Sequence, residues 1–277
     1  MTPDNNQPAR DLLAFYAEAG VDAPLDETPR DRFGVPETSR APAHAAERSA
    51  AAMRAPAPLP VASMPVASMP AVPVPPPPEE AVMAARAAAQ SAATLEELRD
   101  ILSGFEGCAL RQTARQIVFA DGNPQARIMF VGEAPGYEED MRGLPFVGRS
   151  GQLLDKMLAA IGLDRTNAYI ANIVPWRPPG NRDPSLHETA ICLPFIQRQI
   201  ELVDPDILVC LGKPATAALL GITDGIRKTR GRWFTYRTEK REIRAIATFH
   251  PAYLLRSPLE KRLAWRDFLA IRKALAH

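Results

Sequence analysis

The chain has 277 residues, with 33 Lys and Arg against 32 Asp and Glu, so its net charge of +1 excludes neither a nucleic-acid partner nor an acidic substrate. No apolar run approaches the roughly 18 residues needed to cross a bilayer, and no basic flank leads into an apolar segment at the start, so we expect a cytoplasmic protein. Three widely spaced cysteines, Cys108, Cys192 and Cys210, argue against a disulfide framework.

The first third of the chain differs from the rest in charge and in proline content. Residues 1–90 hold 7 basic and 11 acidic side chains, together with 16 of the 28 prolines. Proline removes a backbone donor, so a segment this rich in proline cannot build a packed core. The remainder suits one domain of roughly 100–200 residues. We therefore predict a disordered Pro/Ala-rich tail ahead of one folded domain.

One short helix is predicted near the start of the chain, within residues 1–35. Over residues 8–20, apolar side chains recur at helical spacing, and Gly20 follows as a stop signal. A helix this short is marginal in water unless it has a surface to pack on. It either packs on the folded part of its own chain or binds a partner.

Residues 36–90 are predicted to form a disordered linker. They contain the repeat PVASM twice at 60–69 and four consecutive prolines at 75–78, which is typical of semi-extended linkers. Order is expected to return in the Ala-rich run 81–90, and at the latest at Thr94, a candidate N-cap with a glutamate three residues later. We place the folded domain at residues 91–277.

After Thr94, short apolar runs alternate with helical patterns. This alternation predicts an α/β fold with a parallel sheet that is covered on both faces. Ligands of such sheets bind beyond the carboxyl ends of the strands, so the loops after the strands are the places to look for chemistry. The predicted strands are 127–132, 168–174, 207–211 and 243–248, and the predicted helices are 148–161, 185–203, 213–220 and 260–276.

The loop after the first strand reads GEAPGYEED over residues 132–140. Two glycines around a proline form a rigid turn that lets backbone N–H groups approach a ligand. Four carboxylates lie within eight positions, so their mutual repulsion would raise some pKa values unless a cation intervenes. The acids also exclude a phosphate-binding loop. The turn is either structural or part of a site.

Two further strand ends carry polar side chains. His250 follows the last strand and is held by Pro251, at the position where an open sheet presents its site. It is either a functional group or a satisfied histidine at the domain edge. Asn172 lies in the second strand, where a buried amide is costly unless it is paired. It either bonds locally or binds the edge of a ligand.

Residues 227–244 form a basic segment. They hold eight basic side chains against two acids, with Trp233, Phe234 and Tyr236 interleaved. The segment is either a solvated β-ribbon or a surface for a nucleic-acid backbone. The sequence leaves both interpretations open.

Taken together, the motifs resemble the type-4 uracil-DNA glycosylases. They follow the family's order over about residues 94–275, and the tail before residue 91 lies outside the resemblance. The resemblance implies a three-layer α/β/α sandwich around a central four-stranded parallel sheet. It also implies hydrolysis of the N-glycosidic bond between uracil and deoxyribose in DNA. The matching stretches are GEAPGYEED (132–140), PFVGRSGQLLD (145–155), NIVPWRPPGNRDP (172–184), CLPFIQRQIEL (192–202) and HPAYLL (250–255).

The resemblance further implies catalytic and pocket residues. Glu133 would hold the attacking water, His250 would donate to uracil O2, and Glu139 would border uracil C5. Phe146 would stack on the flipped base, and Asn172 would match O4 and N3–H of uracil but not the amine of cytosine. A site of this kind rejects a wrong base because its buried polar groups are left unpaired. Gly132 and Ala134 complete the predicted substrate-binding set.

The resemblance also implies contacts to DNA. Leu254 or Leu255, with Arg256 beside them, would fill or brace the hole that the flipped base leaves in the duplex. Arg182 is the remaining predicted DNA contact. We expect a monomer that acts on uracil-containing DNA and that lies with the nucleoid, and a repair or replication protein is the expected partner if the helix at 8–20 binds one.

The chain departs from the family at its metal site. The family usually binds a 4Fe-4S cluster through four cysteines, and the corresponding positions here are Phe105, Cys108, Trp176 and Cys192. Because two ligands are missing, we expect no cofactor and no metal, with the two aromatic residues filling the space as an apolar plug. A cluster completed by a non-cysteine ligand is the alternative. Cys210, inside the third strand, is expected to be a core thiol.

Two other functions deserve comparison with a glycosylase. The first is a module that binds uracil or a damaged base without efficient hydrolysis, which Glu133, Asn172 and His250 disfavour. The second is a nucleotide-binding Rossmann-like enzyme, which the absence of G-x-G-x-x-G after the first strand disfavours. Release of uracil from a labelled oligonucleotide separates the first alternative from a glycosylase.

Overall fold

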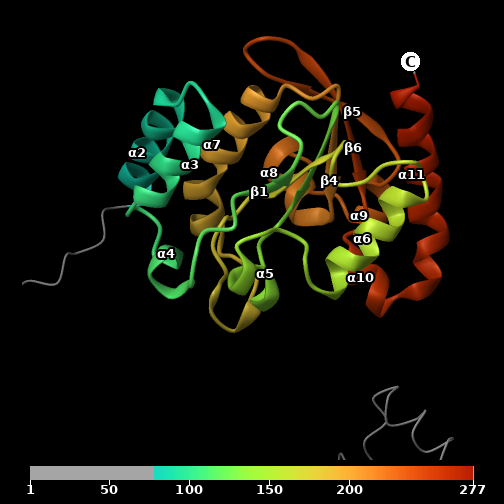
Figure 1. Cartoon of the computed structure of the whole chain (residues 1–277), viewed down its shortest axis with the longest axis horizontal. Helices are drawn as coiled ribbons and strands as arrows, with labels where there is room; N and C mark the ends of the chain where they lie inside the picture. Colours follow the sequence, from blue (N-terminus) through green and yellow to red (C-terminus); the bar gives the residue numbers. More distant parts are fainter. Residues whose placement is uncertain (1–77, 277) are drawn as a thin grey trace, which may run out of the picture. The chain divides into compact units, whose positions relative to one another are not determined.

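A computed structural model describes residues 78–276; the predicted helix within residues 1–35 lies outside this range. In the described part, a six-stranded sheet lies between layers of helices (Figure 1). The predicted three-layer α/β/α architecture is thus confirmed. The strands are β1 (Ala120–Gly122), β2 (Ile128–Gly132), β3 (Tyr169–Asn172), β4 (Ile207–Leu211), β5 (Trp233–Arg237) and β6 (Glu242–Thr248).

The sheet has two more strands than the four that were predicted. Its order is β1-β3-β2-β4-β6-β5, and the four central strands are parallel, as expected. The two edge strands run antiparallel to their neighbours. β1 has only three residues, which is too short to show a period, and β5 is masked in the sequence by the surrounding basic residues. Within residues 227–244, β5 and the start of β6 pair antiparallel, but they form the edge of the main sheet and are not a separate solvated ribbon. The nucleic-acid interpretation stays a prediction.

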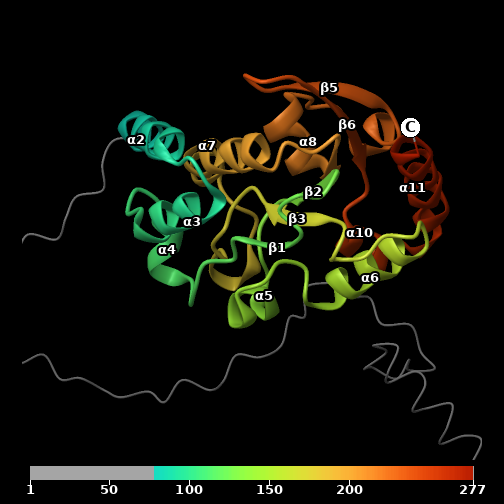
Figure 2. The same cartoon turned by 45° about the horizontal axis from the view of Figure 1, so that its top comes forward.

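The two faces of the sheet are covered by different helices (Figure 2). The α-helices are α2 (Pro78–Ser91), α3 (Leu95–Gly104), α4 (Leu110–Thr113), α5 (Tyr137–Arg142), α6 (Arg149–Ala159), α7 (Leu186–Val203), α8 (Lys213–Leu220), α9 (Ile226–Thr229), α10 (Pro251–Arg256) and α11 (Lys261–Leu275). Two short 3₁₀ helices, η1 (Pro179–Asn181) and η2 (Pro258–Glu260), complete the elements.

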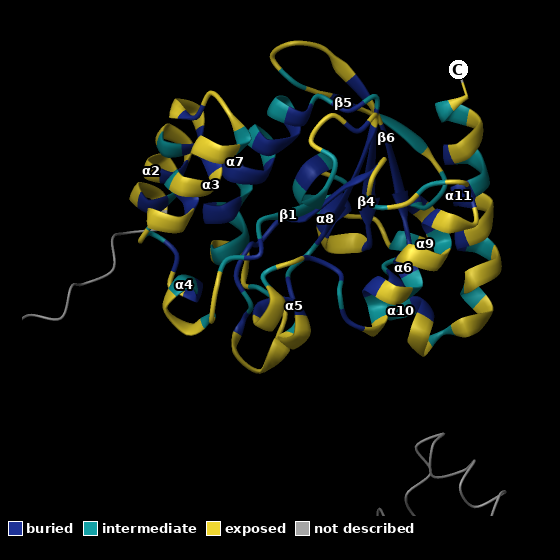
Figure 3. Ribbon diagram, viewed as in Figure 1, coloured by how far each residue is buried: buried dark blue, intermediate teal, exposed yellow. Residues whose placement is uncertain are grey.

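Alternation along the strands divides the core between the two faces. On β2, Met129 and Val131 belong to the cluster that includes residues of α2, α3 and α7, whereas Ile128 and Phe130 belong to the cluster that includes residues of α6 and α11. Period-two alternation with both faces buried produces a continuous apolar strand. Figure 3 shows the central strands as mostly buried and the outer sides of the helices as exposed. Among the described helices, none is long and apolar enough to cross a membrane.

Helix α2 corrects the predicted end of the linker. It begins at Pro78, inside the range 36–90 that was predicted to be disordered. Ala81, Ala85 and Ala89 recur at a spacing of four residues and are buried, because they form the stripe of α2 that packs on α7. The return of order expected in the Ala-rich run 81–90 is therefore confirmed, and the linker boundary predicted at residue 90 lies too late in the chain. The next helix starts as predicted, since Thr94 accepts a hydrogen bond from the backbone N–H of Glu97 at 3.1 Å.

Candidate active site

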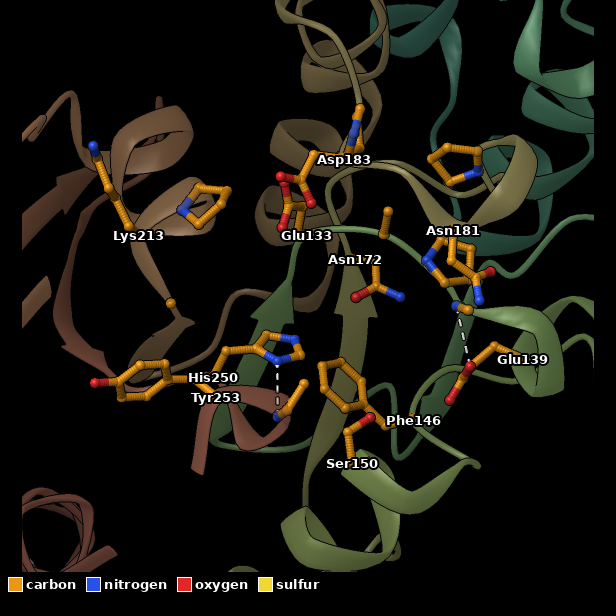
Figure 4. A pocket seen from close by; sticks show the side chains of 18 of the residues that line it. Glu133, Glu139, Phe146, Ser150, Asn172, Asn181, Asp183, Lys213, His250 and Tyr253 are labelled. Carbon is orange, nitrogen blue, oxygen red and sulfur yellow. Dashed lines mark hydrogen bonds between the residues drawn. The ribbon is translucent and has the colours of Figure 1, made fainter. Parts of the chain in front are cut away.

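A cavity of about 460 Å³ opens at the carboxyl ends of β2, β3, β4 and β6. Its walls come from the loops that follow these strands, as expected for an open parallel sheet. Figure 4 shows side chains from the separate loops pointing into one space. Of the predicted site residues, the cavity brings together Glu133, Ala134, Glu139, Phe146, Asn172, Arg182, His250 and Arg256.

Gly132, at the end of β2, lies beneath the two predicted pocket side chains. A Cβ atom at this position would lie 2.5 Å from Asn172 Oδ1 and 2.6 Å from Phe146 Cζ. These separations are too short for a side chain of any other residue. The close approach of the Asn172 amide and the Phe146 ring therefore requires glycine here, and this explains the predicted place of Gly132 in the site.

Asn172 holds a polar atom that has no partner. It pairs with Gly132 in the β2–β3 register and is 5% exposed. Its Oδ1 atom is buried without a hydrogen bond within the described structure. A buried acceptor without a partner costs about 1–3 kcal/mol, so it indicates a group that is satisfied only when a ligand is present.

The rings of Phe146 and His250 lie side by side, with their centroids 5.4 Å apart and their planes at 33°. Phe146 is 4% exposed and has a φ of 54°, a backbone conformation that residues other than glycine rarely adopt. Unusual backbone of this kind persists only where the surroundings hold it in place. The turn therefore presents one flat apolar face to the cavity.

His250 is held as a neutral imidazole. It is the N-cap of α10, and its Nδ1 accepts a hydrogen bond from the Ala252 N–H at 3.1 Å. Burial and the nearby Arg256 lower the pKa of His250 to about 4, against an opposing effect of Glu139. Since Nδ1 is an acceptor, the remaining proton lies on Nε2. The cavity thus gains a neutral N–H donor.

Glu133 and Asp183 bring two carboxyl groups to the opposite wall of the cavity (Figure 4). Burial, together with the neighbouring Asp183 carboxylate, raises the pKa of Glu133 to about 7. A carboxyl group with this pKa can hold or release a proton near neutral pH, which is the property that acid–base chemistry needs.

Glu139 lines the cavity, but its carboxylate is engaged by the backbone. Oε1 accepts hydrogen bonds from the N–H groups of Val147 at 3.0 Å and Gly148 at 2.9 Å, and Oε2 accepts one from Gly136 at 3.1 Å. The side chain therefore connects the first loop to the turn that carries Phe146. This contact explains why a carboxylate is buried here without a basic partner.

The structure corrects one predicted DNA contact. Leu254 is fully buried in a small core cluster with Phe249 and Ala264, so it cannot enter a duplex. Leu255 is 36% exposed, and Arg256 lies at the cavity rim. Leu254 faces inward because the two leucines lie on different sides of α10. Arg182 forms a bidentate ion pair with Glu188, at 2.6 and 2.8 Å, which fixes it beside the cavity.

Several cavity residues were missed in the sequence. Lys213 and Tyr253 follow strand ends, and Asn181 and Asp183 lie in the matching stretch 172–184. The strand-end rule could have found Lys213. Asn181 is held by Arg177, whose Nε donates to its Oδ1 at 2.6 Å. Nothing in the sequence shows that this long proline-rich loop returns over the pocket.

The predicted plug residues lie in the core cluster that includes residues of α3, α4 and α7. Cys108, Cys192 and Trp176 are buried in this cluster, and Phe105 packs against it. The two thiols are 4.0 Å apart, and the Phe105 ring lies edge-on to Phe195 at 5.1 Å. Phenyl and indole groups cannot ligate iron, so this donor set does not fit a cluster that needs four thiolates. Cys210 is a buried core thiol, as expected.

Much of the basic segment, residues 227–244, lies away from the cavity. The hairpin tip precedes β6, whereas α10, with His250 as its N-cap, follows it, so the tip and α10 lie at opposite ends of that strand (Figure 1). Arg237 pairs with Glu242 at 3.0 Å, and the Arg244 guanidinium lies 4.4 Å from the Trp233 ring centroid. These basic groups thus have partners within the protein.

Comparison with known proteins shows the family to which the chain is similar. The family model of the uracil DNA glycosylase superfamily matches residues 119–269. A type-4 uracil-DNA glycosylase of Sulfurisphaera tokodaii is 38% identical over 65% of this chain and 84% of its own length. One of Thermotoga maritima is 43% identical over 59% of this chain and 86% of its own length. One of Archaeoglobus fulgidus is 38% identical over 64% of this chain and 92% of its own length.

Proposed function

The chain belongs to the uracil-DNA glycosylase superfamily and, within it, to the type-4 enzymes. We propose that it removes uracil from DNA by hydrolysing the N-glycosidic bond and thereby initiates base excision repair. The observation that carries the proposal is the unpaired Oδ1 of Asn172 beside the Phe146 ring, in a cavity that also holds His250 and Glu133.

Asn172 and Phe146 would recognise the base. The amide can accept from N3–H of uracil through Oδ1 and donate to O4 through Nδ2, and cytosine offers the opposite pattern at these positions. The Phe146 ring provides a face on which the pyrimidine can stack. Discrimination follows because a wrong base leaves buried polar groups unpaired.

His250 and Glu133 would act on the bond that breaks. Negative charge develops on uracil as the base leaves, and a neutral Nε2–H donor at O2 stabilises it. Positive charge develops on the sugar, and a carboxylate at Glu133 both stabilises that charge and holds the attacking water. Water then supplies the hydroxyl group at C1′ and the proton that uracil takes up.

The uracil must leave the duplex to reach this cavity, because its glycosidic bond is shielded within the stack. Leu255 and Arg256, on α10 beside His250, are proposed to occupy the position that the base leaves. Glu139 is proposed to act by holding the Phe146 turn as well as by bordering the base, since its oxygens accept three backbone hydrogen bonds.

We further propose that the enzyme works without an iron–sulfur cluster. The resemblance places Phe105 and Trp176 at two of the four ligand positions. Trp176 lies in the core cluster that also holds Cys108 and Cys192, and Phe105 packs against it, so their apolar bulk would fill the volume of the iron–sulfur cluster and stabilise the same loops. Anaerobic purification followed by iron and acid-labile sulfide analysis tests this. Stoichiometric iron and sulfide would contradict it.

The activity is tested by incubating the purified full chain with labelled oligonucleotides that contain one uracil. We expect abasic product from single-stranded U, from U:G, or from both, and none from T:G, because Glu139 would crowd the C5 methyl group of thymine. Binding of uracil-containing DNA without base release would instead support a lesion-binding protein.

A further inference from the structure

Arg165 lies outside the cavity, yet its contacts converge on the turn that carries Phe146. We infer that Arg165 is a positioning residue for base excision, which acts by holding Phe146 against the base; this inference rests on the proposed function. Sequence motifs gave no reason to select it, because it follows α6 in a short loop before β3.

The guanidinium of Arg165 donates to the two backbone carbonyl groups on either side of the Phe146 Cα atom. Nη1 donates to the Pro145 carbonyl at 3.1 Å, and Nη2 donates to the carbonyl of Phe146 itself. These bonds fix the peptide planes on both sides of the residue whose φ is 54°. The left-handed backbone is thereby held by specific donors.

Two carboxylates hold the guanidinium in turn. Nη1 lies 2.5 Å from Asp121 Oδ2 on β1, and Nε lies 2.9 Å from Asp155 Oδ1 on α6. The Arg165 side chain is only 24% exposed, so these pairs are partly shielded from solvent. A planar guanidinium can serve two acids and two carbonyls at once, which a lysine ammonium cannot do with the same geometry.

The opposite side of the turn is held by Glu139 and Gly151. Glu139 accepts the N–H groups of Val147 and Gly148, directly after Phe146. Gly151 lies against the turn, and a Cβ there would be 1.7 Å from the Phe146 carbonyl oxygen. Arg165 thus binds the carbonyl groups of the turn, and Glu139 binds its N–H groups. Together they hold the turn in one conformation, in which the Phe146 ring lies over Gly132 and beside His250.

The first experiment measures single-turnover uracil release by the full chain. Arg165→Ala is expected to lower the rate on the order of 10- to 100-fold, since small displacements of a positioning group cost this much. Arg165→Lys should keep part of the rate. Arg165→Ala should add little in a Phe146→Ala background, because a residue that acts through Phe146 has nothing to position there.

Arg241→Ala is the matched control. Arg241 also contacts two carboxylates and one backbone carbonyl. The carboxylates belong to Asp204 and Asp206, and the carbonyl is that of Asp204. It lies before β6, away from the cavity. We expect similar losses of thermal stability in the two Arg→Ala variants and a loss of excision rate only in Arg165→Ala.

A second readout does not depend on activity. The Phe146 ring should shift the His250 imidazole proton resonance through its ring current, and His250→Gln identifies that resonance among the four histidines. Arg165→Ala and Gly151→Ala should move it, whereas Arg241→Ala should not. An unchanged resonance, a parental rate in Arg165→Ala, or full additivity with Phe146→Ala would overturn the inference. A parent chain that releases no uracil would refute the proposed function and with it a role in excision, whereas the resonance would still show whether Arg165 holds Phe146 in place.

Discussion

Polar side chains at the two ends of the parallel strands differ in whether they are paired within the protein. At the amino ends, Arg127, Asp206 and Arg241 directly precede β2, β4 and β6, and they pair with one another at 2.6 to 3.3 Å. At the carboxyl ends, Asn172 has an unpaired oxygen, the pKa of Glu133 is raised and that of His250 is lowered. The end that holds the unpaired amide oxygen and the two shifted pKa values is the one suited to a ligand.

The sharpest test of this contrast is Asn172→Asp. A carboxylate cannot donate to uracil O4 and would repel the developing uracil anion. Loss of one such donor typically costs about 2.7–4 kcal/mol of transition-state stabilisation, or roughly 10²- to 10³-fold in rate. Single-turnover excision at saturating enzyme measures the loss, with a melting curve to confirm folding. Activity within about threefold of the parent would mean that the pocket is assigned wrongly.

The two leucines of α10 should separate stability from function. Leu254→Ala leaves a cavity in a packed core and should cost about 2–5 kcal/mol in the free energy of unfolding. Leu255→Ala should leave stability nearly unchanged and lower excision from duplex DNA more than from single strands. Denaturant unfolding and paired rate measurements check both. Equal effects of Leu255→Ala on the two substrates would remove it from the duplex contact.

Helix α2 predicts where the chain can be shortened. A chain that starts at residue 78 should keep its excision rate, since the residues that line the cavity all follow residue 132. A chain that starts at residue 92 uncovers α7 and should lose on the order of 3 kcal/mol, at about 0.8 kcal/mol for each buried methyl-sized group. Thermal melting of the two chains decides this. Equal melting temperatures of the two chains would mean that the packing of α2 on α7 does not stabilise the fold.

The pH dependence tests the carboxyl pair. In the proposed mechanism Glu133 acts as a carboxylate, so the excision rate should rise with pH through about 7 as this group loses its proton. Asp183→Asn removes the like charge, which lowers the pKa of Glu133 and moves the rise to lower pH. The shift should be partial, because burial is the larger cause. Rate profiles of the parent, Asp183→Asn and Glu133→Gln measure it; a rise that persists in Glu133→Gln belongs to another group.

The sequence predicted the central strands and the end of the sheet where the cavity opens, because both depend on short local patterns. The roles of Glu133, Glu139 and Phe146 came from the resemblance and stay predictions. β2 is apolar throughout, and Asn172 and His250 stand at strand ends, where a parallel sheet brings loops together. Burial on α10 depends on the neighbouring helix, so no local pattern separated Leu254 from Leu255. The role of Arg165 depends on three elements that meet only after folding. Tertiary contacts of this kind leave no periodic signal in the sequence.

The smallest expected effect concerns the basic segment, and it tests the paired end of the sheet. Each phosphate contact contributes about 0.7–0.9 to the slope of log affinity against log salt concentration. Arg256→Ala, at the cavity rim, should lower the magnitude of that slope by about 0.7–0.9, the contribution of one phosphate contact. Arg237→Glu with Lys240→Glu should leave it unchanged, because these groups lie at the hairpin tip beyond the amino end of β6. Titration of uracil-containing DNA with both variants at several salt concentrations compares them directly. A lower slope in the basic-segment variant would show that DNA also reaches the end of the sheet where the charges are already paired, and the contrast between the two ends would then fail.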